Sequence, residues 1–421
     1  MAPRSPVRGP RRSRGRRIGA RFSALVGSDA ASVRQGLAAL LVSSGGDLLA
    51  GLTLGAITGT LQELPGLLVL VPAAIGMRGN VFGALGSRLG TAIHEGTFRL
   101  SRRADTVVGQ NVLASMALTL SVSLALAVLA KAVAVGFGLS NTISITDFVV
   151  ISVVGGVVSS IAVLGLTLAV AAASVRRGWD LDNVGAPLVT AAGDMVTLPS
   201  LFLATFLVGI PVLSPLLAAA TAALAAAALI AAFRAGLPLL TRILRESLPV
   251  LILAGTIDVV AGLTIEKRLA SFLAFPGLLV LVPPFLEDTG ALGGILSSRL
   301  ASKLHLGILE PSNIPQRPAR GDFILTFLYA IPVFILVAVS SDIAATVAGL
   351  ATPGVGRMVA ISLIGGLLAT TFAVGIAYYG AVLAVRLGLD PDNHGIPLIT
   401  SSMDLIGAFA LILAVVLVGL P

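Results

Sequence analysis

Apolar stretches follow one another along the whole of this 421-residue chain, each about 20 residues long, the length of helix that crosses a hydrocarbon core about 30 Å thick. Only 11% of the residues are charged and 56% are hydrophobic, whereas soluble domains carry about 25% charge. The sequence therefore predicts an all-α polytopic membrane protein. The segments between the stretches are too short for a soluble catalytic, nucleotide-binding or DNA-binding domain.

The formal net charge of +8 comes from the start of the chain, because residues 1–21 hold eight arginines and no acid. A segment rich in Arg, Pro, Gly and Ser cannot form a hydrophobic core. We expect residues 1–33 to be a disordered cytoplasmic tail that lies near anionic lipid headgroups. The rest of the chain is electrically balanced, so no nucleic-acid partner is expected.

The chain repeats itself. The letters PGLLVLVP occupy residues 65–72 and return at 276–283, 211 positions later, and an internal repeat of this kind marks two homologous halves. Each half contains five apolar stretches, and a further one near 213–233 joins them. We therefore expect a first repeat at residues 34–210, a connecting helix and cytoplasmic linker at 211–246, and a second repeat at 247–421.

The number of stretches predicts how the two halves are oriented. Five is odd, so directly fused halves would be inverted, and the connecting helix makes them parallel, with a pseudo-twofold axis along the membrane normal. Most arginines between the stretches fall on the same side as the tail, which the excess of basic residues in cytoplasmic loops assigns to the cytoplasm. We expect about eleven transmembrane helices in the cell membrane, with the N-terminus cytoplasmic and the C-terminus outside.

Four aspartates lie inside these stretches, and the repeat pairs Asp47 with Asp258 and Asp194 with Asp404. Acids at this depth are costly and usually face a cavity or an ion path. Asp194 and Asp404 lie about ten residues into the fifth stretch, roughly 15 Å deep at 1.5 Å per residue. In a parallel repeat these two should face each other across the axis. The structural alternative is that an Asp pairs with an Arg or caps a break in the backbone.

The second stretch of each half carries helix-breaking residues. Pro72 cannot donate a backbone hydrogen bond, and glycines follow it, so we expect a broken helix whose free carbonyls line a cavity. Pro283 and Pro284 predict the same break in the second half.

The copies of this second stretch differ in charge. Met77 and Arg78 of the first half correspond to Asp288 and Thr289 of the second, and Glu287 precedes them. If both segments line one path, that path is asymmetric in charge. The alternative is that Glu287 or Asp288 caps the half-helix that follows the break.

The available ligands favour a hard cation. The chain has no Cys and three His, which argues against zinc or copper and for oxygen ligands. Magnesium suits them best, because it keeps several of its waters and needs only one or two carboxylates. Manganese and cobalt fit nearly as well, whereas calcium usually takes more direct ligands.

The segment PGLLVLVPAAIGMRGNVFGALGSRLGTA, residues 65–92, resembles the signature of the solute-carrier 41 magnesium transporters and their prokaryotic relatives, whose membrane domain is of the MgtE type. The segments 180–194 and 390–404, each with Asp at both ends and Gly-x-Pro between, are similar to the last helix of MgtE. The resemblance implies a pore on the pseudo-twofold axis, lined by the second and fifth helices of each half.

The same resemblance places Asp194 and Asp404 at the central ion site, with Asn80 beside them. Asp47, Asp258, Glu287 and Asp288 complete our set of candidate metal ligands. The partners are then Mg²⁺ or a similar divalent cation, as the transported ion rather than a cofactor, and the lipid bilayer. MgtE proteins are homodimers of five-helix units with cytoplasmic regulatory domains, whereas this chain contains both units and can form a pore alone.

Two other functions use membrane-embedded aspartates. A proton- or sodium-coupled cation exchanger would need the same residues as a channel. An intramembrane aspartyl protease also uses two Asp, and Ala192-Gly193-Asp194 faintly resembles the Gly-x-Gly-Asp motif of those enzymes, although the first Gly is missing. We favour a transporter over an enzyme.

Overall fold

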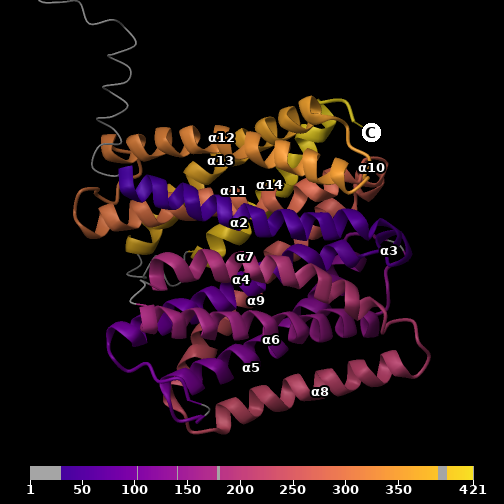
Figure 1. The fold of residues 1–421 in the computed structure, drawn as a ribbon, viewed down its shortest axis with the longest axis vertical. Helices are drawn as coiled ribbons and strands as arrows, with labels where there is room; N and C mark the ends of the chain where they lie inside the picture. Colours follow the sequence, from indigo (N-terminus) through magenta and orange to yellow (C-terminus); the bar gives the residue numbers. More distant parts are fainter. Residues whose placement is uncertain (1–29, 102, 140, 178–180, 387–395, 421) are drawn as a thin grey trace, which may run out of the picture.

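The fold is known from a computed structural model, which describes residues 30–101, 103–139, 141–177, 181–386 and 396–420. Within these ranges the chain forms eleven long helices and two short ones, and no strand (Figure 1). The long helices are α2 (Ala30–Ala56), α4 (Leu67–His94), α5 (Val107–Gly136), α6 (Ile145–Arg177), α7 (Leu181–Thr205), α8 (Leu213–Arg234), α9 (Pro238–Glu266), α11 (Gly277–His305), α12 (Arg317–Val347), α13 (Val355–Arg386) and α14 (Ile396–Leu417). The short ones are α3 (Thr58–Glu63) and α10 (Leu269–Ala274).

The prediction of a polytopic all-α membrane protein is confirmed. Nine of the described helices are long and apolar enough to cross a membrane. Most of the predicted tail lies outside the described residues, and its last four residues, 30–33, already belong to α2.

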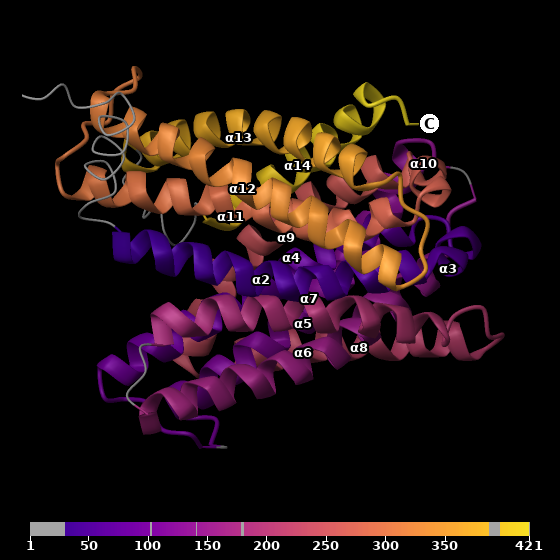
Figure 2. The same ribbon diagram turned by 45° about the horizontal axis from the view of Figure 1, so that its top comes forward.

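The order of the helices follows the repeat. The series α2, α4, α5, α6, α7 is matched by α9, α11, α12, α13, α14, and the same pairs pack together in each series, for example α4 with α7 and α11 with α14. The short helices α3 and α10 lie at the same end of the bundle (Figures 1 and 2). This is the arrangement that a parallel repeat predicts, because an inverted repeat would place them at opposite ends.

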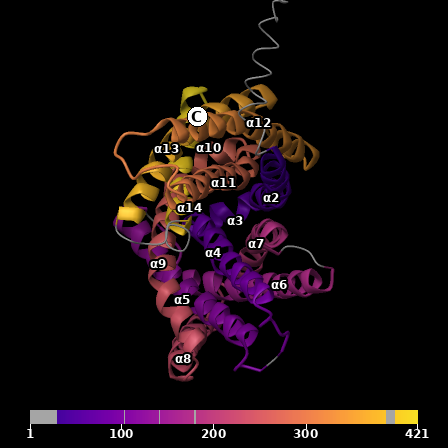
Figure 3. The same cartoon turned by 90° about the vertical axis from the view of Figure 1, so that its left-hand side faces the viewer.

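The connecting helix α8 lies at one edge of the molecule, where it packs on α5 and α6 (Figure 3). The opposite edge is formed by α12 and α13, and α2, α4, α7, α9, α11 and α14 lie between (Figure 3). The second and last helices of both series therefore occupy the centre of the bundle.

The first helix of each half packs against the second helix of the other half: α2 on α11, and α9 on α4. Glycines permit these close contacts. A Cβ on Gly262 of α9 would lie 2.6 Å from the carbonyl oxygens of Leu68 and Val69 on α4, closer than atoms can pack. Gly51 of α2 lies against the backbone of Val280 on α11 in the same way. The two halves therefore share one core.

The expected break in the second helix of each half is wrong. Both α4 and α11 are continuous, with Pro72 and the pair Pro283 and Pro284 inside them. Each proline lies near the start of its helix, where it removes one hydrogen bond to the preceding turn, and dense packing on both sides holds the helix together. Of the glycines that suggested a break, Gly76 lies against the Asp258 side chain of α9.

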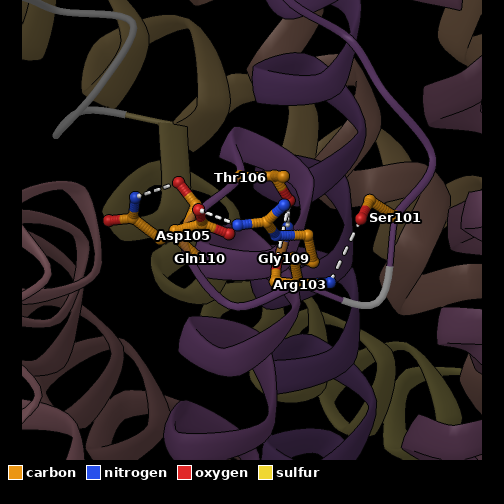
Figure 4. A network of polar contacts seen from close by, with 6 residues as sticks. All are labelled: Ser101, Arg103, Asp105, Thr106, Gly109 and Gln110. Carbon is orange, nitrogen blue, oxygen red and sulfur yellow. Dashed lines mark hydrogen bonds and ion pairs between the residues drawn. The ribbon is translucent and has the colours of Figure 1, made fainter.

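The start of α5 is fastened by its own polar groups (Figure 4). The Thr106 hydroxyl oxygen accepts a hydrogen bond from the Gly109 N–H at 3.0 Å, a common way to satisfy the free N–H groups of a first turn. The Gln110 side chain donates to the carbonyl oxygen of Asp105 at 3.3 Å and accepts from the Leu240 N–H of α9 at 3.2 Å. Gln110 therefore ties the first turn of α5 to the first helix of the second half.

Candidate cation site

Six acidic side chains gather in the centre of the bundle, contributed by five helices. They are Asp47 of α2, Asp194 of α7, Asp258 of α9, Glu287 and Asp288 of α11, and Asp404 of α14. Asp47, Asp194 and Asp258 are each 1% exposed, and Asp288 is fully buried. Glu287 and Asp404 are half-buried. Carboxylates at this depth are costly and usually face a cavity, an ion path or a proton path.

The four aspartates that the repeat pairs in sequence form two different pairs in space. The Asp47 carboxyl group contacts that of Asp194, and the Asp258 carboxyl group contacts that of Asp404. Each pair thus joins the first and last helices of one half. Asp194 and Asp404 also interact electrostatically, so they do lie near one another, but the direct neighbour of each is the aspartate of its own half.

Glu287 lies between the two pairs. Its charge acts on Asp47 and Asp194 of the first half and on Asp258 and Asp404 of the second. The position that matches it in the first half is Gly76. A Cβ on Gly76 would lie 2.8 Å from Asp258 Oδ2 and 4.0 Å from Asp404 Oδ2. Helix α11 therefore supplies a carboxylate where α4 has a glycine packed against the Asp258 carboxyl group.

Asp288, the neighbour of Glu287, has its own partner. The Ser44 hydroxyl of α2 is 3.1 Å from one oxygen of this carboxylate and 3.0 Å from the other. Both acids lie well inside α11, which begins at Gly277. The alternative that either one caps a half-helix is therefore wrong, because no helix begins near them.

The alternative that the aspartates pair with arginine is also wrong. Both carboxylate oxygens of Asp47, Asp194 and Asp258 are buried without a hydrogen-bond donor, and the charged groups that act on them are other acids. Arg78, which is 1% exposed, points away from them. Its Nε donates to Ser159 Oγ at 2.8 Å.

Asn80 lies one turn after Gly76 on α4 and is half-buried on the same face, but no described hydrogen bond joins it to the acids. Within the described part of the chain, no three acidic or histidine side chains converge as a ready-made metal cage.

Two features of the site escaped the sequence argument. The Ser401 hydroxyl lies beside Asp258, and the signal was available, since Ser401 precedes Asp404 by three residues and so shares its helix face. The second is the close approach of Gly76 to Asp258, which the alignment of Gly76 with Glu287 in the repeat could have indicated.

Fold and site together indicate a polytopic membrane transport protein, with buried carboxyl groups at its centre. The chain belongs to the MgtE family of divalent cation transporters, whose profile matches residues 71–204 and 282–414. It is a divalent cation transporter rather than an enzyme, so the aspartyl protease alternative is discarded.

Curated relatives agree with this assignment. Solute carrier family 41 member 3 of Rattus norvegicus is 27% identical over 404 residues, which cover 88% of this chain and 85% of the relative. Solute carrier family 41 member 2 of Homo sapiens is 26% identical over 374 residues, covering 82% of this chain and 63% of the relative. No solved structure matches the chain.

Proposed function

We propose that the chain transports Mg²⁺ along its pseudo-twofold axis, through a path lined by the second and fifth helices of each half, α4, α7, α11 and α14. The observation that carries this proposal is the gathering of buried carboxylates that lack hydrogen-bond donors. Uncompensated acids at this depth are too costly to serve packing alone, and a divalent cation supplies the missing charge.

The two aspartate pairs suggest a role for each acidic residue. Asp194 and Asp404 bind the ion or its inner waters from opposite sides of the axis, and Asp47 and Asp258 support them from the neighbouring helices. Glu287 adds a negative charge between the pairs. Asp288, held by Ser44, and Asn80, one turn further along α4, act on the hydrated ion from a greater distance.

A single chain contains both halves of this path. Because α2 packs on α11 and α9 packs on α4, each half depends on the other. We therefore propose that one chain forms a complete pore in the cell membrane, with the N-terminus in the cytoplasm and the C-terminus outside. Tagging each terminus and probing it from one side of intact cells tests this orientation, and it fails if both tags appear on the same side.

The decisive experiment is cation uptake into proteoliposomes of the purified protein at a controlled membrane potential. We expect saturable Mg²⁺ uptake that excess Mn²⁺ or Co²⁺ inhibits. Uptake that requires an imposed proton or sodium gradient would identify a coupled exchanger instead of a channel. Absence of Mg²⁺ uptake, with uptake of another divalent cation intact, would overturn the magnesium assignment.

A further inference from the structure

Exposure along α4 and α11 changes abruptly at the depth of the acids. Residues 66–74, which lead into α4 and form its first turns, are all buried, and so are residues 277–286 of α11. Beyond them, one face of each helix is partly or fully exposed as far as the helix end. The exposed positions on this face are Gly76, Asn80, Gly83, Ser87 and Thr91 of α4, and Glu287, Ala291, Gly294, Ser298 and Ser302 of α11.

These ten positions correspond residue for residue under the repeat, and they carry small or polar side chains. The partly exposed Ile295, beside Gly294, is an apolar exception. Faces of this bundle that are exposed to lipid carry large apolar groups instead, such as Phe372 and Leu383 of α13. Both strips begin at the depth of the acids. The composition and the abrupt start both indicate an internal passage.

Other contacts show that these faces turn toward the site. Gly76 lies against the Asp258 carboxylate, whose oxygens have no hydrogen-bond donor. Gly290, beside the α11 strip, lies 3.8 Å from Asp404 Oδ1, measured from a Cβ built on the glycine. Cβ atoms built on Gly83 and Gly294 meet no atom within 4 Å, so space is open along both strips.

We propose that these strips form a water-filled access passage for the hydrated cation, open only toward the C-terminal ends of α4 and α11. The N-terminal thirds of the two helices, residues 67–74 and 277–286, form a closed plug on the other side of the acids. This inference rests on the proposed function for the identity of the ion, but the passage itself is a property of the bundle. Arg99 and Arg317, which follow these helices, assign the open end to the predicted cytoplasmic side.

The chain has no native cysteine, so single cysteines can be placed without altering a background. The test uses Ala84→Cys, which is partly exposed beside Gly83 of the α4 strip, and Ala291→Cys on the α11 strip. Both are placed in nanodiscs, where a charged membrane-impermeant thiol reagent reaches both faces. Ala73→Cys is the matched control in the plug of α4, and Ala223→Cys on the exposed face of α8 is the control for lipid exposure.

We expect both strip cysteines to react at least about tenfold faster than either control, a difference that corresponds to about 1.4 kcal/mol or more. Ala73→Cys reacting as fast as Ala84→Cys would overturn the plug. Strip cysteines as unreactive as Ala223→Cys, although labelled after denaturation, would overturn the passage.

Magnesium then separates this inference from the proposed function. Mg²⁺ should slow the modification of Ala291→Cys, which lies one turn from Glu287, and leave the low rate of Ala223→Cys unchanged. Fast modification that Mg²⁺ does not affect would count against the magnesium assignment while upholding the passage, because thiol accessibility does not depend on which ion is carried.

Discussion

The two halves of the bundle differ in the side chains that fill one equivalent interior region. In the first half the Arg78 guanidinium lies between α4 and α6. It donates to the Ser159 hydroxyl at 2.8 Å and to the Ala74 carbonyl oxygen at 2.9 Å. In the second half Thr289 replaces Arg78, and the rings of Phe285 and Phe334 pack there, with centroids 5.2 Å apart. One interior is polar and charged and the other is aromatic.

This difference shows what the repeat preserves. Helix pairing and the glycines at close contacts recur in both halves, since Gly156 lies against Arg78 where the equivalent Gly366 lies against Phe334. The side chains between α4 and α6 differ in type from those between α11 and α13. Toward the axis the divergence is of another kind, since Gly76 and Glu287 change the charge of the site itself.

The largest effect is expected where the halves are alike. Asp194→Asn and Asp404→Asn, separately, should each remove most Mg²⁺ uptake, because each takes one carboxylate from a contacting pair. The thermal unfolding temperature should not fall, since neutralisation relieves the cost of a buried charge. Uptake and unfolding are measured on the same preparations, with Asp105→Asn in the exposed α4–α5 loop as control. Wild-type flux in the double variant would refute the site.

The next effect tests the asymmetry at the axis. Glu287→Gln should raise the Mg²⁺ concentration for half-maximal uptake by about tenfold or more, because it removes a charge that acts on both pairs. Glu246→Gln removes an exposed carboxylate of α9 and serves as the matched control. An unchanged half-maximal concentration in Glu287→Gln would show that the two halves contribute equally despite their different charge.

Much of this architecture could be predicted from the sequence. The apolar stretches predicted the polytopic all-α class, and the repeat at residues 65–72 and 276–283 predicted two series of helices in the same order. The candidate acids followed from one physical rule, that a carboxylate inside the bilayer is costly and usually has a functional role. That rule selected Asp47, Asp194, Asp258 and Asp404.

The remainder depends on tertiary contacts that local rules cannot supply. A repeat offset states which residues are equivalent but not which are neighbours. The packing of α2 on α11, and of α9 on α4, was therefore not predictable. For the same reason the contact between Asp47 and Asp194 was missed. The rule that proline breaks a helix failed at Pro72 because packing on both sides outweighs one lost hydrogen bond.

A stability measurement sharpens the comparison of the two interiors. Ser159→Ala introduces the residue that the second half carries at the equivalent position, Ala369, and leaves Arg78 Nε without its acceptor. We expect a loss of about 1–3 kcal/mol, seen as a lower unfolding temperature in detergent. Thr371→Ala, which removes an exposed hydroxyl bonded within its own helix, is the control. Uptake per folded molecule should not change, and a fall in uptake without a loss of stability would place Arg78 on the ion path.

The smallest effect concerns two glycines of α6. A Cβ on Gly156 would lie 2.7 Å from Arg78 Nη2 and 2.5 Å from Ser123 Oγ, whereas a Cβ on Gly165 meets nothing within 4 Å. Alanine is favoured over glycine inside a helix by up to about 1 kcal/mol, so Gly165→Ala should raise the unfolding temperature slightly. Gly156→Ala should lower it, because Arg78 is held at two of its nitrogens and cannot withdraw without losing a hydrogen bond. Equal changes in unfolding temperature for Gly156→Ala and Gly165→Ala would mean that the Arg78 guanidinium moves aside without cost. The polar interior of the first half would then not be rigid.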